Sequence, residues 1–451
     1  MKIPIEPNAP TLKSTRRKFL GTSAAAGAVA ALPASLSAQV EGNSTLKLAL
    51  IGCGGRGTGA ANQNLTTEGT KLVAMADVFR GEGTDSTGIE KALENLNQRH
   101  KDKIDVPDEN KFVGFDGYLK AIEVADIVIL TTPPGFRPMM IEAAVEAGKH
   151  IFSEKPVCVD APGYRRVLAA AKKADEKGLK CVVGLQRHYQ KSYLETLAKI
   201  KSGMIGDIVS AQVWWNGAGV WVRNRQPEDT EMRYQCRNWY YFNWLCGDNI
   251  TEQHIHNLDV ANWYIGADRG KEFAHPISAQ GMGGREVRDG DARFGEIFDH
   301  HYVEFRYENG IIVNSQCRHQ PKTWSKVAEE FLGTNGRASE GKITNRAGDQ
   351  TMWSHRGRND ENPYQVEHNV LLEHIKEDKP INNLYYGANS SMTSVFGRMC
   401  TYSGKELKWE DAIKSDKSDF PDVLAWDAMP KVLPGEDGLY PVPVPGVTEV
   451  I

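Results

Sequence analysis

The sequence predicts an α/β domain with a parallel, doubly wound sheet, followed by an α+β domain with a largely antiparallel, open sheet. Two observations support this division. Up to about residue 205, apolar runs of strand length alternate with helical segments. Beyond it, strand-like runs follow one another, and Asn309-Gly310 between two of them is a hairpin turn signal. A chain of 451 residues is long enough for two such domains.

The first domain is placed at residues 46–157. Apolar runs at 46–51, 71–76, 125–130 and 149–152 each have the length of a buried strand. Helices are expected between them, at about 87–100 and at 138–147, the second ending before Gly148. Strands that alternate with helices form βαβ units, and such units build a parallel sheet.

The second domain is placed at residues 158–430. Strands are expected at 208–215 and 331–336, and a hairpin is expected from 300–307 and 311–317. Late helices are expected at 364–376 and 391–401, and one of them is a candidate to pack back on the first domain. The proline-rich tail, 431–451, is expected to run extended over the surface or over a partner subunit.

An export leader precedes the first domain. Arg16-Arg17 stands before an alanine-rich apolar run, 21–32, and small residues follow up to Ala38. This layout is typical of a twin-arginine signal peptide over residues 1–38, with 39–45 as a linker. The alternatives are a chance arginine pair and an uncleaved anchor, but about 12 apolar residues are too few for a span of about 20. We expect a periplasmic or otherwise extracytoplasmic protein without a stable membrane span.

Composition excludes several function classes. The net charge is −4, and the charged residues, 25% of the chain, mix both signs. This argues against a nucleic-acid-binding surface and against a polybasic membrane patch. The seven cysteines are widely spaced and form no Cys-x-x-Cys pair, so no disulfide framework can be recognised. We expect buried thiols, with Cys236 and Cys246 as the pair to test.

A glycine cluster directly follows the first predicted strand. Gly52-Cys53-Gly54-Gly55-Arg56-Gly57 fits the pattern G-x-G-x-x-G, and Asp77 ends the next strand about 20 residues on. Glycines let the backbone approach a pyrophosphate, and the acid accepts hydrogen bonds from a ribose diol. The pattern predicts a bound dinucleotide, and a glycine-rich turn in an unrelated α/β protein is the alternative. Asp77 would repel a 2′-phosphate, so NAD is favoured over NADP, although Arg80 keeps NADP open.

Glu154-Lys155-Pro156 follows the predicted strand at 149–152, and Thr131-Thr132-Pro133-Pro134 follows the strand at 125–130. With the glycine cluster, these segments make residues 46–400 resemble the Gfo/Idh/MocA oxidoreductases. The resemblance implies a Rossmann domain, then an α+β domain whose open sheet joins subunits into a homodimer or homotetramer. It also implies that Lys155 lies near the nicotinamide and the reacting carbon, and that a cis bond precedes Pro156. The cofactor contacts that it implies are Thr131, Thr132, Pro133, Arg137 (where the family usually has a histidine), Glu154, Lys155 and Gln186.

The family's second signature, Asp-x-x-x-His, maps onto Glu252 and His256, so that Glu replaces Asp. An imidazole suits removal of a hydroxyl proton, and a nearby ammonium stabilises the developing alkoxide. On one continuous helix, Glu252, His256 and Asp259 would share a face, and a carboxylate could hold the imidazole tautomer. Lys155, His256 and Glu252 are therefore the predicted catalytic residues. The alternative is a metal held by Glu252, His254, His256 and His188. We expect no metal, because on a helix His254 and His256, at i and i+2, would point about 200° apart and could not share one ion.

The resemblance implies polar substrate contacts after a sixth strand of the first sheet, and the polar segment 184–189 lies at that place. Aromatic and basic residues then crowd the segment from 214 to 244. Tryptophan faces stack on sugar rings, and Arg and Asn side chains bind hydroxyl groups. The alternative is packing in the core or at a subunit interface. The predicted substrate-binding residues are Arg187, His188, Trp215, Asn216, Trp221, Arg237, Trp239, His254 and Asp259.

Three functions remain open from the sequence. The first is an NAD-linked oxidoreductase acting on a CH–OH group of a sugar, glycoside or polyol such as inositol, with a tightly bound, recycled cofactor. The second is a glycosidase that uses NAD transiently, by oxidation at a ring carbon, elimination and re-reduction. The third is a non-catalytic sugar-binding protein on a Rossmann scaffold, which the presence of both Lys155 and His256 disfavours.

Overall fold

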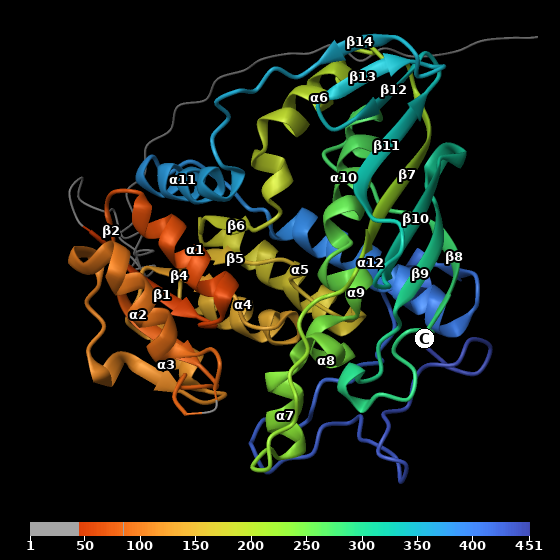
Figure 1. Cartoon of the computed structure of the whole chain (residues 1–451). Helices are drawn as coiled ribbons and strands as arrows, with labels where there is room; N and C mark the ends of the chain where they lie inside the picture. The colour runs from red at the N-terminus through yellow and green to blue at the C-terminus, as the bar shows by residue number, and fades with distance from the viewer. Residues whose placement is uncertain (1–44, 84) are drawn as a thin grey trace, which may run out of the picture. The chain divides into compact units, whose positions relative to one another are not determined.

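The structure, a computed structural model, describes residues 45–83 and 85–451. The expected export leader and nearly all of the expected linker lie outside these residues. Two sheets organise the described chain, one six-stranded and one nine-stranded (Figure 1). None of the helices in 45–83 and 85–451 combines the length and the apolar character needed to cross a membrane.

The six-stranded sheet is parallel throughout and has the order β3-β2-β1-β4-β5-β6. This confirms the doubly wound α/β fold, because strand order reverses between β1 and β4, as it does in Rossmann domains. The sheet extends past residue 157, where we placed the domain boundary, because β6, the sixth strand that the resemblance implied, pairs with β5. The strands are β1 (Leu46–Ile51), β2 (Thr70–Asp77), β3 (Lys111–Val113), β4 (Ile127–Leu130), β5 (His150–Ser153) and β6 (Cys181–Val183).

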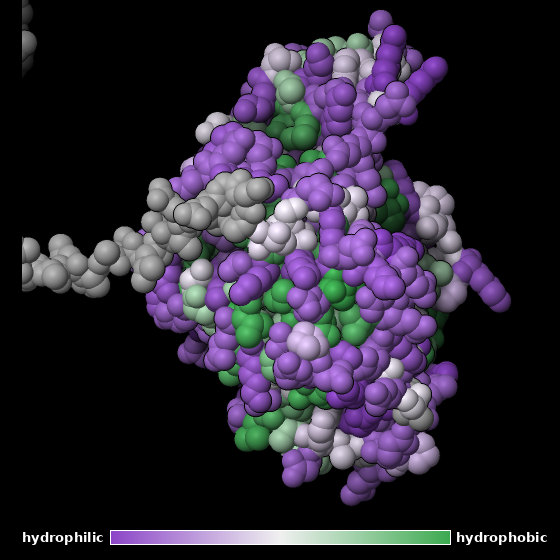
Figure 2. Space-filling view, turned by 90° about the vertical axis from the view of Figure 1, so that its left-hand side faces the viewer, coloured by the Kyte–Doolittle hydropathy of each residue, from purple (hydrophilic) through white to green (hydrophobic). Residues whose placement is uncertain are grey.

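Helices cover both faces of this sheet. Leu48 and Leu50 of β1 point to the face that α1 (Gly55–Thr66), α2 (Ile89–His100) and the late helix α11 (Pro363–Lys376) cover with apolar side chains. The outward side of this half is mostly hydrophilic, with smaller apolar areas between polar side chains (Figure 2). The opposite face packs against α3 (Gly117–Glu123), α4 (Arg137–Glu146) and α5 (Ala161–Glu176).

The nine-stranded sheet is mixed and mostly antiparallel, with a parallel pair formed by β7 and β10. The expected hairpin is confirmed as the antiparallel pair β9 and β10. In order along the chain, the strands are β7 (Ile208–Gly217), β8 (Ser278–Gly284), β9 (His300–Arg306), β10 (Ile312–His319), β11 (Lys326–Gly333), β12 (Gly336–Ser339), β13 (Lys342–Asn345), β14 (Thr351–Ser354) and β15 (Leu407–Lys408).

Helices pack against one side of this second sheet (Figure 1). The longest, α12, begins at Leu384, whereas the sequence predicted a start at 391. Its side chains are buried almost all round, so the sequence carries no alternation of polar and apolar residues to mark its first turns. The helices of this half are α6 (Lys191–Lys201), α7 (Glu231–Arg237), α8 (Asn243–Cys246), α9 (Asn249–Glu252), α10 (Ile255–Asp268), α12 (Leu384–Ser403) and α13 (Trp409–Ala412).

A buried carboxylate fixes the start of α9. Asp248 is fully buried at φ 70°, and it accepts hydrogen bonds from the Phe298 N–H at 2.9 Å and from the Tyr402 hydroxyl at 2.5 Å. His301 Nε2 lies 3.3 Å from the same carboxylate. Burial raises the pKa of Asp248, but the charge of His301 and these hydrogen bonds outweigh it and bring the pKa to about 2. Asp248 thereby ties α9 to the second sheet and to α12.

We expect Asp248→Asn to lower the free energy of unfolding at neutral pH by about 2 kcal/mol. The folded pKa of about 2 lies below the ordinary 3.8, so this stabilisation is present above pH 3.8 and is lost as the pH falls toward 2. Urea unfolding at neutral and acidic pH measures it, with the exposed Asp289→Asn as control. An Asp248→Asn protein whose stability depends on pH as steeply as that of the wild type would contradict the assignment.

Candidate functional site

The turn between β1 and α1 forms one wall of a pocket. A Cβ at Gly57 would lie 2.0 Å from the Gly52 carbonyl oxygen, so only glycine allows the helix to approach the strand this closely. No side chain caps the first turn of α1, and a Cβ on Gly54 or Gly55 would meet nothing within 4 Å. Free N–H groups therefore face open space at a helix N-terminus, which suits the pyrophosphate of a dinucleotide.

The pocket has a volume of about 440 Å³ and lies at the carboxyl ends of β1 and β4, where the strand order reverses. Of the predicted cofactor residues, it is lined by Gly52, Gly54, Gly55, Arg56, Gly57, Asp77, Thr131, Thr132 and Pro133. Sequence reasoning missed Val78, Phe79, Asp85, Ser86, Thr87, Gly114, Phe115, Tyr118, Phe136 and Met140. The available signal was topological, because the loops after β2 and β3 lie beside the nucleotide in this fold.

Asp77 is held by the backbone at one end of the pocket. Its two carboxylate oxygens accept hydrogen bonds from the N–H groups of Cys53 at 2.6 Å and Phe79 at 2.9 Å. Burial raises the pKa of Asp77 to about 6. The Cys53 side chain points away from the pocket toward the Ala76 carbonyl, which corrects its prediction as a lining residue. Asp77 is thus placed to meet a ribose diol, with its orientation already fixed.

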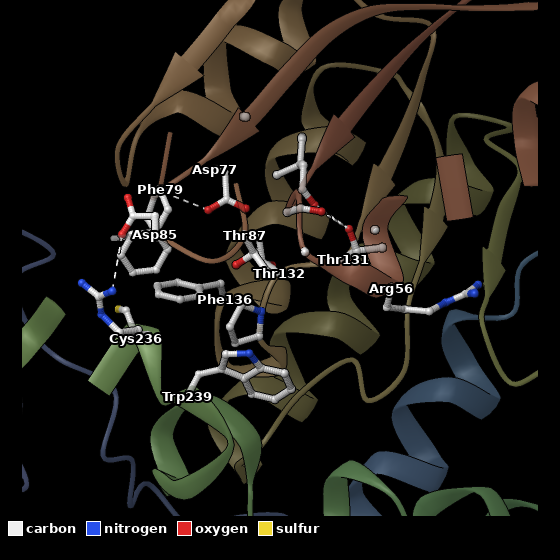
Figure 3. A pocket seen from close by; sticks show the side chains of 18 of the residues that line it. Arg56, Asp77, Phe79, Asp85, Thr87, Thr131, Thr132, Phe136, Cys236 and Trp239 are labelled. Carbon is white, nitrogen blue, oxygen red and sulfur yellow. Dashed lines mark hydrogen bonds and ion pairs between the residues drawn. The ribbon is translucent and has the colours of Figure 1, made fainter. Parts of the chain in front are cut away.

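The opposite wall comes from the second half of the chain. Trp221, Arg237 and Trp239, predicted to bind substrate, line the same pocket as the glycine turn, together with Arg223 and Cys236. Figure 3 shows Asp77 and Asp85 toward one end, Arg56 at the other, and Trp239 across from Thr132. The sequence shows a cluster of aromatic and basic residues but not which part of the site it faces, and substrate contact by these three residues stays a prediction.

The irregular segment that follows α13 packs beside this wall. The Trp426 ring packs on Phe115 at 4.7 Å and on Phe79 at 5.6 Å between ring centroids. Arg233 of α7 lies over the Trp426 ring and forms an ion pair with Asp85 at 2.7 Å. We call α7 together with Trp426 the cover. The cover joins the second half of the chain to the end of the pocket beside Asp77.

Lys155 follows β5 and contacts the second half of the chain. Its ammonium donates hydrogen bonds to the Glu252 carbonyl and, at 3.1 Å, to the Glu252 carboxylate. The peptide bond before Pro156 is cis. The Glu154 carboxylate pairs with Arg56 at 2.5 Å and accepts the Lys155 N–H at 3.2 Å, so it links this cluster to the pocket without lining it. Two sequence-distant segments therefore meet beside the nucleotide pocket.

Arg137 supports this arrangement from behind. It is buried, and its guanidinium donates to the carbonyls of Thr132, at 2.7 Å, and Pro156. It does not line the pocket, so the predicted direct cofactor contact is corrected to support of the two loops that carry Thr132 and Lys155. Gln186 does not line it either, and its buried Oε1 has no partner among the described residues.

His256 has the neutral imidazole expected of a proton acceptor, but it lies after a break in the helix and, in the described part of the chain, lacks the expected carboxylate partner. Burial, then the charge of Lys155, lowers its pKa well below the ordinary 6.5. Its buried Nδ1 has no hydrogen-bond partner within 45–83 and 85–451, and its ring stacks on Trp215 at 5.8 Å. We expected one continuous helix, but α9 ends at Glu252 and α10 begins at Ile255.

The break separates the predicted carboxylate partners. Asp259 accepts hydrogen bonds from His188 at 2.9 Å and from Ser390 at 2.8 Å, so it orients His188 rather than His256. The remaining predicted substrate residues also bond within the protein. His254 contacts Ser315 at 2.8 Å, Asn216 contacts Gln316 at 3.3 Å, and Arg187 pairs with the buried Glu329. These residues were predicted from their position in the chain. In the folded protein they are wholly or largely buried, and other protein groups take up their hydrogen bonds.

The alternative metal ligands do not converge. Glu252 binds Lys155, His188 binds Asp259, and His254 binds Ser315. Within the described ranges, no group of three or more His, Cys, Asp or Glu side chains is placed to hold a metal. All seven cysteines are free and buried, the proposed test pair Cys236 and Cys246 included.

The comparisons with known proteins agree with this geometry. The family model described as "Oxidoreductase family, NAD-binding Rossmann fold" matches residues 46–184. A "Glycosyl hydrolase family 109 protein" of Shewanella putrefaciens is 24% identical over 326 residues, which cover 66% of this chain and 65% of the relative. The chain thus spans just under two thirds of that relative's length.

Two solved structures share the fold. Aldose-aldose oxidoreductase from Caulobacter crescentus, complexed with glycerol, matches with a TM-score of 0.61 and 17% identity over 81% of this chain and 99% of that one. Scyllo-inositol dehydrogenase from Lactobacillus casei, with bound NAD(H) and scyllo-inositol, matches with a TM-score of 0.59 and 17% identity over 82% and 100%. Residues 46–184 of this chain thus match the model of the Gfo/Idh/MocA oxidoreductase family, and the solved structures share its fold.

Proposed function

We propose that the protein is an NAD-dependent oxidoreductase that acts on a CH–OH group of a sugar or polyol. The observation that carries the proposal is the Lys155–Glu252 pair beside a glycine-lined pocket, near enough to His256 for the Lys155 charge to lower the pKa of its imidazole. An alcohol gives up a proton and a hydride in such a reaction, and this cluster provides for the proton and for the charge on oxygen.

Each residue of the cluster has a separate task. Bound NAD would supply the hydride acceptor. Glu252 fixes the Lys155 ammonium with two acceptors, its carbonyl and its carboxylate, which leaves the third N–H of Lys155 for the substrate oxygen. His256 is unprotonated, so it can take the hydroxyl proton while Lys155 stabilises the oxygen from which the proton leaves.

We also propose that the cofactor stays bound through turnover. The cover, α7 with Trp426, lies over the end of the pocket beside Asp77 and is held by the Arg233–Asp85 ion pair and two aromatic contacts. A dinucleotide can leave this end only if these contacts break. Retention would also suit the expected twin-arginine export, which moves folded proteins to a compartment without a nucleotide pool.

A second candidate function uses the same cluster without net oxidation. Oxidation at one ring carbon of a glycoside acidifies the neighbouring C–H, which permits elimination of the leaving alcohol, addition of water and return of the hydride. The name of the Shewanella relative, a glycosyl hydrolase family 109 protein, supports keeping this candidate. A retained cofactor is a requirement of this scheme, so the cover favours it as well.

The two candidates differ in what accumulates. We expect myo-inositol or D-glucose to change the nicotinamide absorbance of the purified protein if it is an oxidoreductase with net turnover. We expect 4-nitrophenyl glycosides to release nitrophenol with no lasting absorbance change of the nicotinamide if it is a glycosidase. A protein that denatures without releasing NAD or NADP, detected by mass spectrometry, and reacts with no probe of either kind would contradict both.

We expect Lys155→Ala to reduce turnover of the reactive probe by roughly 100- to 10,000-fold, because the ammonium that stabilises the substrate oxygen is lost. The dinucleotide should remain bound, since Lys155 does not line the pocket. Stopped-flow absorbance and mass spectrometry of the released nucleotide measure the two effects. The exposed Lys172→Ala on α5 is the matched control, and a Lys155→Ala protein as active as this control would refute the assignment.

We expect Trp426→Ala to speed release of the dinucleotide by roughly 10- to 30-fold, because two aromatic contacts worth about 1 kcal/mol each are lost. Dilution of the purified protein into excess adenosine diphosphate ribose, followed by filtration at intervals, gives the release rate. Trp324→Ala is the matched control, because that side chain is 59% exposed and does not line the pocket. Equal release rates for the two variants would mean that the cover does not retain the cofactor.

A further inference from the structure

The turn between α9 and α10 contains Gln253, which belongs neither to the glycine cluster nor to the two residues, Glu252 and His256, that match the family's second signature. Gln253 follows Glu252 directly and is half-buried. Its Oε1 lies 2.6 Å from Nε2 of His319, the last residue of β10. Gln253 therefore stands next to the Lys155–Glu252 pair, with its amide tied to the second sheet.

Hydrogen-bond chemistry fixes which way this amide points. Arg288 Nη2 lies 3.0 Å from His319 Nδ1, and a guanidinium can only donate, so Nδ1 must accept. Burial lowers the pKa of His319 to about 3, so the ring is neutral and carries its single proton on Nε2. That proton requires an acceptor, which is the Gln253 Oε1. The NH₂ group of Gln253 then has to face away from His319.

We call the hydrogen-bonded series Arg288–His319–Gln253 the relay. Arg288 and His319 are held firmly in place. Arg288 is 3% exposed and donates a second hydrogen bond to the Phe298 carbonyl at 3.0 Å. Its guanidinium lies over the Tyr241 ring at 5.3 Å. The His319 ring, itself buried, stacks on Tyr240 at 5.8 Å. Neither Arg288 nor His319 can turn without breaking contacts on several sides.

The NH₂ group of Gln253 belongs to the residue next to Glu252 and points away from His319. No described residue accepts a hydrogen bond from it. In the β7–β10 register, Cys317 pairs with Trp215 and His319 pairs with Gly217, so Trp215 and His319 point to the same face of the sheet. Trp215 stacks on His256. Gln253 and His256 thus contact side chains on one face of the sheet, His319 and Trp215, and the buried hydroxyl of Tyr240, unpartnered among the described residues, belongs to the ring that stacks on His319.

We infer that Gln253 is a substrate-binding residue whose NH₂ group donates a hydrogen bond to an oxygen of the sugar or polyol, and that Arg288 and His319 are positioning residues that hold this donor in place. The substrate role of Gln253 rests on the proposed function, which supplies the nature of the substrate. The hydrogen bonds among Arg288, His319 and Gln253 do not depend on it, because they are contacts within the protein.

The first test measures, without any substrate, which ring nitrogen of His319 carries the proton. In the holoenzyme labelled with ¹⁵N-histidine, the ring nitrogens of His319 should show a neutral ring with the proton on Nε2 at every pH at which the protein is folded. The His319→Phe variant identifies the signals. A proton on Nδ1, or a ring that becomes charged near its ordinary pKa, would overturn the relay.

The second test measures how the Gln253 NH₂ group contributes to substrate binding, with myo-inositol and a 4-nitrophenyl glycoside as probes. We expect Gln253→Ala to raise KM by about tenfold, with a smaller effect on kcat, because one hydrogen bond to the substrate is lost. His319→Phe should raise KM in the wild-type background and have no further effect on KM in a Gln253→Ala background. An unchanged KM in Gln253→Ala, or effects of the two variants that add, would overturn the assignment.

These outcomes separate the inference from the proposed function. Inert wild-type protein with a correct His319 tautomer would contradict the proposed function and, with it, the substrate role of Gln253, while the relay stands. Active wild-type protein with an unchanged KM in Gln253→Ala would contradict the substrate role alone. Bound dinucleotide in each variant, measured by mass spectrometry, confirms that the variant has folded.

Discussion

The contact between Lys155 and Glu252 is the interaction on which the arrangement of the site depends. It joins the end of β5 in the parallel sheet to the end of α9, which packs on the mixed sheet. The side chains of both residues are largely buried, at 13% and 15% exposed, so neither charge could be left alone at low cost. The nucleotide pocket and the His256 region are thereby held side by side, although about 100 residues separate the two partners in sequence.

Much of the fold followed from local patterns. The strand predicted at residues 46–51 is β1 with the same bounds, and the glycine cluster after it forms the turn that the spacing indicated. Both features depend on neighbouring residues only, since a buried parallel strand is apolar throughout and a close helix–strand approach requires glycine. The hairpin of β9 and β10 was recognisable for the same reason, from alternation around a turn.

The site was less predictable where side chains choose partners across the fold. Asp259 has the right spacing to serve His256, yet a break before α10 and the nearness of His188 give it another partner. Trp221 and Trp239 were predicted to bind substrate, but the sequence could not show that they line the pocket of the glycine turn. Trp426 carried no signal at all, because the irregular segment after α13 has no periodicity from which its packing could be inferred.

The cover has a consequence for how such a protein would meet its substrates. A nucleotide that stayed bound through turnover, as proposed, would make the whole protein the carrier of the hydride, with one oxidised and one reduced form. Donor and acceptor molecules would then visit the same place in alternation, and neither would ever encounter the other. The ratio of the two in the surroundings, rather than the redox state of any free nucleotide pool, would set the direction in which the protein runs.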